Sequence, residues 1–386
     1  ISGSNQDPYY VGNVARIGPD TTPNTNSNLG YASGIEIEIL SAPGEIMDVS
    51  VRFNRHQDGW PRQQTAPAFG VAPKRAELGG QATVLTGARP ENGWSIDGDP
   101  ITLPGYETIW TPAIGRITQP DSDEVLFSSG QSPSLWSQDQ HVSIADVGGT
   151  SFGPVSAPPL IAAFPTQITD VWAHETGTVA WGIFGPSSGQ VSLGNSPIRG
   201  IASGDIDGDG QNELVALDAI GGLSAIEATQ SVIPLGTIDN VIGTPVIADL
   251  DGSGTAEVIV ASTDGSLSIF AGTEVLTSRP VPGGAASTPI LSDIDGDGFV
   301  EVLFGGIDRV WVIRFNGVPQ ANTPYEIPIK DKAGRMTAPL VADLDADGAL
   351  DVIVASEDGV VYAISSEGLS LPGFPILATG RITTSP

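Results

Sequence analysis

The stretch DIDGDGFVEVLFGG (293–306) carries the pattern that decides how this chain folds. Related nine-residue phrases begin at three other places: DIDGDGQNE at Asp205, DLDGSGTAE at Asp249 and DLDADGALD at Asp343. Each copy has an oxygen-bearing side chain at positions 1, 3, 5 and 9 and glycine at position 4 or 6. A run of strand-forming residues follows each copy: LVAL, VIVAS, VLFGG and VIVAS. The pattern therefore predicts four acidic loops, each leading into a β-strand.

Carboxylates at alternate positions of a short loop repel one another unless a cation lies between them. Hard oxygen ligands in a flexible loop are the ligands that calcium prefers. We therefore predict about four calcium ions, one in each loop. The second loop should bind least tightly, because Ser253 replaces a carboxylate. The predicted ligands, with a backbone carbonyl at position 7, are Asp205, Asp207, Asp209, Gln211 and Glu213; Asp249, Asp251, Ser253, Thr255 and Glu257; Asp293, Asp295, Asp297, Phe299 and Glu301; and Asp343, Asp345, Asp347, Ala349 and Asp351.

Two other interpretations of these loops were weighed. An EF-hand shares the DxDxDG opening but needs a glutamate at position 12 and a helix on each side. Position 12 holds Ala216, Val260, Phe304 and Val354, and strands follow the loops, so the EF-hand is rejected. A metal-free acidic turn between strands would account for one copy. Four copies with the same ligand spacing favour metal binding over a metal-free turn.

The acidic loops belong to a longer repeat. Most copies of the repeat have a proline four residues before loop position 1, and Ile201 replaces this proline once. The anchor positions are 67, 112, 159, 201, 245, 289 and 339, which are 42 to 50 residues apart. This period is typical of a four-stranded propeller blade. The sequence thus predicts an all-β fold, a seven-bladed β-propeller of four-stranded antiparallel blades.

The first three repeats keep the strands and lose the metal ligands. TPAIGRITQPDSDEVLFSS (111–129) parallels TPVIADLDGSGTAEVIVAS (244–262) almost position for position. Arg116 occupies the place of Asp249, and an arginine does not coordinate a cation. Val71 and Ala163 occupy that place in the first and third repeats. We expect no calcium in these three repeats.

The loops and their anchors resemble the FG-GAP (VCBS) repeat, the unit of the integrin-α-type β-propeller. The resemblance covers residues 63–386, with the four acidic repeats closest to the pattern. It implies a calcium-stiffened propeller that serves outside the cell in adhesion or partner binding. The integrin partner loops have no match in this sequence. The same repeat also occurs in bacterial surface proteins and polysaccharide lyases.

Residues 1–62 form a separate segment of the predicted architecture. A polar connector is followed by GIEIEIL–SAPGE–IMDVSVRFN (34–54), whose alternating pattern predicts a β-hairpin annex. The hairpin resembles the tail that follows the catalytic domain of immune-inhibitor-A-type secreted metallopeptidases. That resemblance implies a piece of a larger secreted or cell-surface precursor, whose other domains are candidate partners. The predicted domains are therefore 1–62 and the propeller at 63–386.

The charge of the chain restricts its partners and its location. The formal charge is −29, with 45 acidic residues against 16 lysines and arginines, which opposes binding to nucleic acid. No apolar run is long enough to insert into a membrane as a helix. Calcium loops of this type fill where calcium is near millimolar. We therefore expect an extracellular protein with a protein or glycan partner.

Catalysis is not expected of this chain. It has no cysteine and no HExxH zinc motif. Ser151 lies in a GxSxG match, but that motif requires a strand–turn–helix context that this glycine- and proline-rich loop does not offer. The predicted function is a non-catalytic, calcium-stabilised binding or structural module. The alternative is a carbohydrate-active propeller, a polysaccharide lyase or a glycan-binding protein, with its site on one propeller face.

Overall fold

The computed structural model describes most of the second half of the chain and shorter parts of the first half. The described residues are 16–17, 35–39, 49–53, 74–78, 81–87, 94–96, 99–101, 110–119, 121–128, 133–137, 140–143, 153–185, 188–264, 266–280, 284–314, 325–328, 334–345, 347–365, 368–378 and 380–382. Pro67, Val71 and Ser151, which the sequence pattern singled out, lie outside them. Residue contacts divide the chain into two units, 1–65 and 66–386, and the sequence analysis placed this boundary after residue 62.

The first unit contains one small antiparallel sheet. Its strands are β1 (Arg16–Ile17), β2 (Ile35–Ile39) and β3 (Val49–Phe53), in the order β1-β2-β3. β2 and β3 pair over their full length, from Ile35 opposite Phe53 to Ile39 opposite Val49. The alternating residues of the predicted hairpin form these two strands, and β1 adds a strand that the sequence pattern did not indicate.

The described part of the second unit is entirely β-structure. It forms seven four-stranded antiparallel sheets, and in each sheet strands adjacent in sequence pair with one another. We number the sheets 1 to 7 in chain order. Sheet 1 is β4 (Lys74–Leu78), β5 (Gln81–Gly87), β6 (Trp94–Ile96) and β7 (Asp99–Ile101); sheet 2 is β8 (Ala113–Gly115), β9 (Glu124–Ser128), β10 (Pro133–Ser137) and β11 (Gln140–Ser143); sheet 3 is β12 (Leu160–Ala163), β13 (Ile168–Ala173), β14 (Thr178–Trp181) and β15 (Gly189–Ser192).

The remaining four sheets contain the four acidic loops. Sheet 4 is β16 (Ile198–Gly204), β17 (Glu213–Asp218), β18 (Gly222–Ile226) and β19 (Val232–Thr237); sheet 5 is β20 (Val241–Ala248), β21 (Glu257–Ser262), β22 (Ser266–Ala271) and β23 (Glu274–Pro280); sheet 6 is β24 (Ile290–Ser292), β25 (Glu301–Gly305), β26 (Arg309–Ile313) and β27 (Tyr325–Pro328); sheet 7 is β28 (Leu340–Ala342), β29 (Asp351–Ala355), β30 (Val360–Ser365) and β31 (Ile376–Leu377). In the described part of the chain, no helix is long and apolar enough to cross a membrane.

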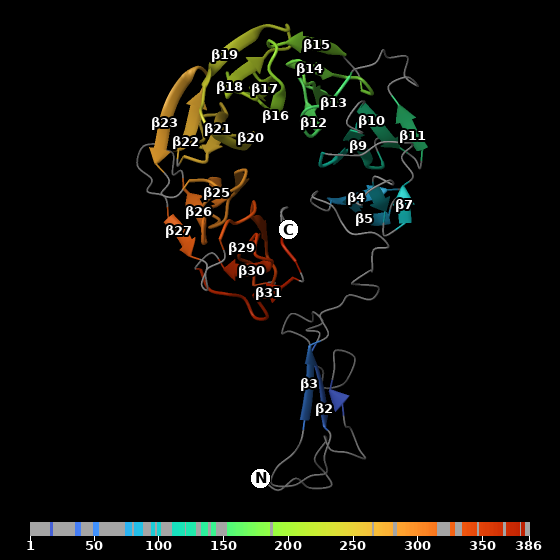
Figure 1. Ribbon diagram of the computed structural model, residues 1–386, viewed down its shortest axis with the longest axis vertical. Helices are drawn as coiled ribbons and strands as arrows, with labels where there is room; N and C mark the ends of the chain where they lie inside the picture. Colours follow the sequence, from blue (N-terminus) through green and yellow to red (C-terminus); the bar gives the residue numbers. More distant parts are fainter. Residues whose placement is uncertain are drawn as a thin grey trace. The chain divides into compact units, whose positions relative to one another are not determined.

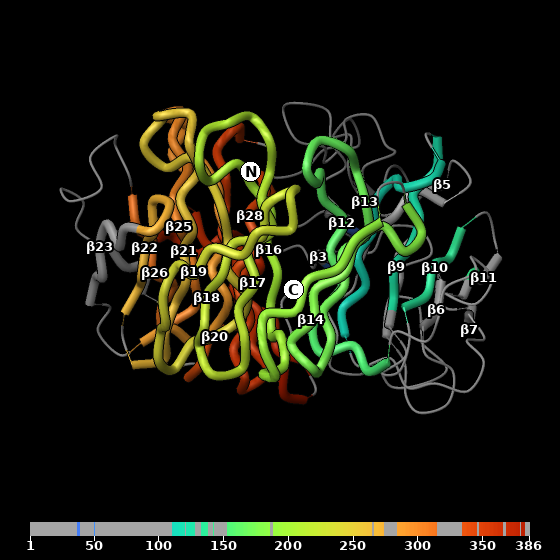
Figure 2. Tube along the Cα trace, turned by 90° about the horizontal axis from the view of Figure 1, so that it is seen from above, coloured from blue at the N-terminus to red at the C-terminus, as the bar shows by residue number. Residues whose placement is uncertain are grey.

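The sheets of the second unit follow one another in sequence order. The first strands β4, β8, β12, β16 and β20 each contact the first strand of the next sheet. Figure 1 shows β12, β16 and β20 toward the centre of this arrangement and β15, β19 and β23 at its periphery. In Figure 2, turned by 90°, the strands run between two faces that carry the connecting loops. In the described part of the chain, the loops that join a first strand to a second strand therefore lie on the same face.

The core lies between neighbouring sheets. One buried cluster joins sheets 3 and 4, with Val171 and Val179 packed with Leu214 and Ile226. Further clusters join sheets 2 and 3, 4 and 5, 5 and 6, and 6 and 7. The continuously apolar second strands account for this packing, since the five residues of β25 and the six of β21 are all buried. The second strands β13, β17, β21 and β25 are thus covered on both faces by adjacent sheets.

Sheet 3 is stabilised by a buried aspartate rather than by an acidic loop. Asp170 is fully buried and accepts four hydrogen bonds, at 2.7 to 3.1 Å from Trp172 Nε1 and the backbone N–H groups of Ile183, Phe184 and Gly185. These bonds hold the loop after β14 against β13. The carboxylate satisfies donors that would otherwise be buried without partners.

We predict that Asp170→Ala lowers the free energy of unfolding by at least about 3 kcal/mol, because it leaves several donors unsatisfied. Asp264→Ala is the matched control, since this exposed aspartate also accepts hydrogen bonds, at 3.0 and 3.2 Å, but only from Ser266 in its own turn. That change should cost less than about 1 kcal/mol. Chemical denaturation of both variants measures the difference, and equal losses would contradict the assigned role.

Candidate metal centres

The four acidic loops occupy equivalent places in sheets 4 to 7. Each joins the first strand to the second, and loop position 9 is the first residue of the second strand. In every case position 9 pairs with the last residue of the first strand: Gly204 with Glu213, Ala248 with Glu257, Ser292 with Glu301 and Ala342 with Asp351. The ladder therefore fixes both ends of each loop.

Three carboxylates of each loop come together in an arrangement that could hold a metal ion. Within each group, one ligand atom per residue lies within 4.8 Å of the others. The groups are Asp205, Asp207 and Glu213; Asp249, Asp251 and Glu257; Asp293, Asp295 and Asp297; and Asp343, Asp345 and Asp347. Of the other predicted carboxylate ligands, Asp209, Glu301 and Asp351 fall outside these groups. The predicted Ser253 hydroxyl and Thr255 carbonyl oxygen lie 3.3 Å apart, joined by a hydrogen bond.

Backbone N–H groups shape the loops around the carboxylate at position 1. The N–H of the position-6 glycine donates to this carboxylate in all four loops, at 2.8 to 3.1 Å. These glycines, such as Gly210 and Gly298, have φ values of 84° and 92°, in a region that disfavours other residues. The conserved spacing of aspartate and glycine thus produces a turn that draws the acidic side chains together.

The carboxylates at position 9 are buried while the others are more exposed. Glu213, Glu257, Glu301 and Asp351 are each at most 4% exposed. Each accepts a hydrogen bond from the N–H of position 2, at 2.8 to 3.0 Å. Burial, helped by the nearby aspartates and opposed by that hydrogen bond, raises the pKa of Glu213 and Glu301 to about 7. Burial likewise raises the pKa of Glu257 and Asp351.

The donor set fits a hard divalent cation. Glu301 Oε2 accepts the Ile294 N–H, whereas Glu301 Oε1 is buried and has no hydrogen-bond partner. A buried carboxylate oxygen without a donor is costly unless a proton or cation compensates it. Only oxygen atoms are available from the predicted ligands, which suits calcium better than transition metals.

Sheet 2 contains a related loop that compensates its buried carboxylate without a cation. Glu124 begins β9 opposite Gly115 and is fully buried, as the position-9 residues are. It accepts hydrogen bonds from the Ile117 and Thr118 N–H groups at 2.8 and 2.5 Å and from the Thr118 hydroxyl at 2.6 Å. Burial opposes ionisation of Glu124, but hydrogen bonds from Thr118, Ser137 and Ile117 outweigh it and lower its pKa.

Arg116 completes this metal-free loop. It occupies loop position 1 and forms an ion pair with Asp123 at 3.3 Å. Arginine in place of the aspartate at position 1 thus removes the first predicted metal ligand and adds a positive charge to the same loop. The contrast between Glu124 and Glu301 shows that the chain offers two ways of satisfying the same buried carboxylate.

The third acidic loop differs from the other three because a cation already contacts it. Arg314 Nη2 lies 3.0 Å from Asp295 Oδ2. Arg314 follows β26, whose Ile313 pairs with Val302. The residues at the equivalent place in sheets 4, 5 and 7 are Glu227, Ala271 and Ser365. A metal ion in this loop would share Asp295 with a guanidinium group.

Adjacent loops contact one another across the boundaries between sheets. The Ala256 N–H donates to the Asp205 carbonyl at 2.8 Å, which joins the second loop to the first. A Cβ atom added at Gly208 would lie 2.8 Å from Thr255 Oγ1. Asn212 N and Nδ2 donate to the carbonyls of Pro165 and Ala163 in sheet 3. A cation that orders one loop would therefore also order the junction between two sheets.

The comparisons with known proteins agree with this geometry. Residues 293–354 match the model of the FG-GAP-like repeat family. The chain carries an FG-GAP-like repeat. The match runs from the third acidic loop through the fourth, so it contains two of the four carboxylate groups. No curated protein sequence matches the chain.

Solved structures are similar to this chain at low sequence identity. The crystal structure of Saccharomyces cerevisiae Sqt1 is similar with a TM-score of 0.51 and 10% identity, over 77% of this chain and 80% of that chain. The crystal structure of BBS1N in complex with ARL6DN gives a TM-score of 0.48 at 13% identity, over 72% and 84% of the two chains. The likeness to Sqt1 shows the fold, which is that of a β-propeller.

Sequence reasoning missed two residues that affect these loops. Glu124 stands under Glu257 when the second and fifth repeats are aligned, so the signal for a buried carboxylate was present in the alignment. Arg314 follows the third strand of its sheet, and no local pattern links it to Asp295, which lies 19 positions earlier (314 − 295). Only the pairing of β25 with β26 brings the two residues together.

The raised pKa values predict how stability depends on pH in the metal-free protein. The ordinary pKa of 4.5 rises to about 7 for Glu213 and Glu301 in the folded state, so folding favours the protonated form. The stability from these two groups should be complete below pH 4.5 and lost as the pH rises to about 7.

Thermal unfolding of metal-free protein between about pH 5 and 8 tests this dependence. Glu301→Gln should flatten part of the trend, whereas Glu124→Gln should leave it intact, because the pKa of Glu124 is lowered. A wild-type melting temperature that rises over this range would contradict the prediction.

We also predict that Arg314→Gln tightens cation binding at the third loop, because it removes a positive charge 3.0 Å from a ligand oxygen. A calcium titration followed by NMR shifts of the Gly298 amide would measure this. Arg309→Gln is the control, since Arg309 lies over the Trp311 ring at 5.5 Å rather than on the loop. Unchanged or weaker binding in Arg314→Gln would contradict the competition.

Proposed function

We propose that this chain is a calcium-stabilised extracellular module with a binding or structural role, part of a larger secreted or cell-surface protein. Its seven sheets would close as the blades of one propeller. The observation that supports calcium most directly is the contrast between Glu301, whose buried Oε1 has no donor, and Glu124, whose donors are complete. When bound, calcium would supply the positive charge that the four acidic loops lack.

The residues of the chain have separate parts in this proposal. The aspartates at positions 1, 3 and 5 would contribute exposed oxygens, with Ser253 replacing one of them. The buried carboxylate at position 9 would anchor the site to the second strand, while the position-2 N–H holds its orientation. The backbone carbonyls of Gln211, Thr255, Phe299 and Ala349 would complete the ligand sets. The ions would stiffen the junctions between sheets and have no reaction to catalyse.

The energetics favour a calcium-rich location. At about 1 mM calcium, a site with a dissociation constant of about 10–100 µM stabilises the fold by roughly 1.4–2.7 kcal/mol. Four such sites would be decisive for a domain of ordinary stability, about 5–15 kcal/mol. The same sites would stay largely empty at the micromolar calcium of the cytosol. The charge of −29 also suits a protein or glycan partner better than nucleic acid or a membrane surface.

We predict that calcium raises the melting temperature and that about four ions bind per chain. Asp293→Asn should lose part of the increase, because it removes the negative charge and replaces one of the two oxygens that accept the Gly296, Asp297 and Gly298 N–H groups. Asp123→Asn is the matched control: it changes an acidic residue of the metal-free loop, which pairs with Arg116, and should keep the full calcium effect.

Differential scanning calorimetry with calcium, with magnesium and without metal measures these effects. Equal melting temperatures with and without calcium would overturn the structural role. A dissociation constant below about 0.1 µM would remove the argument for an extracellular location, because such sites also fill inside cells. Hydrolysis or cleavage of a glycan by the purified chain, abolished by one substitution, would overturn the non-catalytic proposal and favour the carbohydrate-active alternative.

A further inference from the structure

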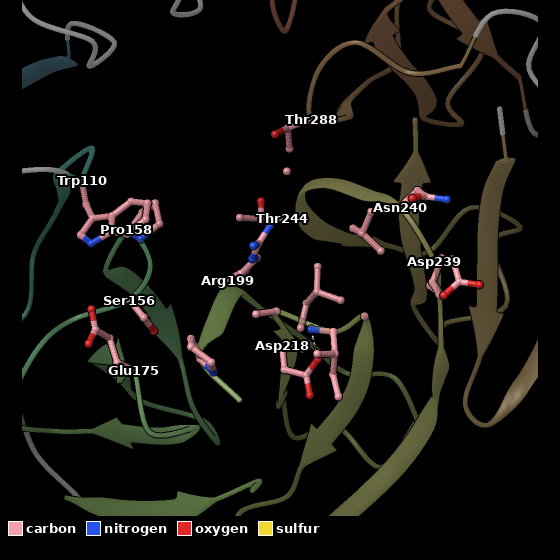
Figure 3. Close-up of a pocket in the computed structure, with 18 of the residues that line it drawn as sticks. Trp110, Ser156, Pro158, Glu175, Arg199, Asp218, Asp239, Asn240, Thr244 and Thr288 are labelled. Carbon is pink, nitrogen blue, oxygen red and sulfur yellow. Dashed lines mark hydrogen bonds between the residues drawn. The ribbon is translucent and has the colours of Figure 1, made fainter. Parts of the chain in front are cut away.

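The face opposite the acidic loops contains a cavity of about 830 Å³, a size typical of small-molecule sites. It lies where the first strands of several sheets begin, and its lining includes Trp110, Ser156, Arg199, Ile220, Thr244 and Thr288. Figure 3 shows Trp110, Arg199 and Thr244 around it. Arg199 lies near the start of β16, and the acidic loop begins after Gly204 at the other end of that strand, about 20 Å away.

Two residues of this cavity are exceptions to the repeat. Trp110 and Arg199 both stand two positions before an anchor, at 112 and 201. The other repeats have a small residue there: Thr65, Ala157, Gly243, Ser287 and Thr337. Because five of the seven repeats have a small residue at this position, the fold does not require a large side chain there. Both large side chains line the same cavity, on either side of the third repeat.

The walls of the cavity are held by contacts between neighbouring sheets. Trp110 Nε1 donates to the Val155 carbonyl at 3.1 Å, and the Ser156 hydroxyl donates to the Ile198 carbonyl at 2.6 Å. A Cβ atom added at Gly200 would lie 2.8 Å from Thr244 Cγ2. The wall is therefore formed before any ligand arrives, which reduces the entropy cost of binding.

The guanidinium group of Arg199 is available to bind a ligand in this cavity. It is exposed, and no hydrogen bond or ion pair joins it to any residue that the structure describes. Asp218 lines the same cavity, but its Oδ1 accepts the Ile220 and Gly222 N–H groups at 2.9 and 2.8 Å. Ile220 is 75% exposed and adds an apolar surface. Glu175 and Asp239 also line the cavity and disfavour ligands with several negative charges.

We propose that this cavity binds a small ligand with a single carboxylate, held by Arg199, and an apolar or ring-shaped body that lies against Trp110 and Ile220. A guanidinium group recognises a carboxylate through two parallel hydrogen bonds. An indole ring offers a flat surface to a sugar ring or an aliphatic chain. The chemistry is shared by an acidic monosaccharide and by the carboxyl end of a short peptide. This site is independent of the calcium proposed for the other face.

Isothermal titration in saturating calcium tests the site with two pairs of probes. Glucuronic acid is compared with glucose, and N-acetyl-leucine with its amide. At least one acid should bind saturably and its neutral counterpart at least about tenfold more weakly. Binding of the sugar acid alone, of the acyl amino acid alone or of both supports the carboxylate site and identifies its source. No saturable binding of either acid, or equal binding of the neutral probes, would overturn it.

Substitutions separate the site from general effects on the fold. Arg199→Gln should weaken binding of the acid about 10- to 100-fold, and Arg199→Lys should restore part of it. Trp110→Phe should also weaken binding of the acid, although it keeps an aromatic ring. The control is Arg381→Gln, since Arg381 is exposed but pairs with Glu357 at 2.8 Å in the last part of the chain.

Wild-type affinity in Arg199→Gln, or equal losses in Arg199→Gln and Arg381→Gln, would overturn the assignment. The melting temperature is measured for each variant, with and without calcium. An intact calcium effect together with absent carboxylate binding would reject this site and leave the proposed function standing. A lost calcium effect with intact carboxylate binding would do the reverse.

Discussion

A buried carboxylate at the start of the second strand is the constraint on which the loop face of this propeller depends. Glu213, Glu257, Glu301 and Asp351 all lie there, and so does Glu124 in sheet 2. Each carboxylate accepts a hydrogen bond from the N–H of loop position 2. The same residue therefore closes the loop and is the first residue of the second strand. A negative charge in this place must be compensated, because the surrounding strands exclude water. The composition of each loop follows from how that compensation is made.

The two forms of the loop differ in where the positive charge comes from. In sheet 2 the compensation is internal: backbone and hydroxyl donors surround Glu124, and Arg116 stands at position 1. In sheets 4 to 7 the added aspartates increase the negative charge, and the pKa of the buried carboxylate rises instead of falling. A loop that accumulates acid beside a buried acid is destabilised alone and is suited to a cation. The third loop is intermediate, because Arg314 contacts one of its ligands.

The sequence predicted what is local and periodic. The spacing of the acidic residues, the strand order and the β-propeller fold all follow from a pattern that is complete within about 45 residues. The contact between Arg314 and Asp295 was not predictable, because it depends on which residues β25 and β26 place side by side. The hydrogen bonds from Asn212 to sheet 3 likewise cross between repeats. The pairing of Trp110 with Arg199 in one cavity required the arrangement of several sheets, although their departure from the repeat is visible in the sequence.

The repeat places the two candidate sites at opposite ends of the first strands. Each first strand begins at the face with the cavity and ends at the face with the acidic loops, so a substitution at one end leaves the other end's ligands in place. The acidic loops are repeated four times, which suits a distributed role in holding sheets together. The cavity is lined by residues of several repeats, among them Trp110 and Arg199, the two that break the small-residue pattern. A repeated feature stabilises a ring, whereas recognition of one ligand needs a feature that occurs once. On this reasoning we propose that the acidic face maintains the structure and that the face with Trp110 and Arg199 binds the ligand.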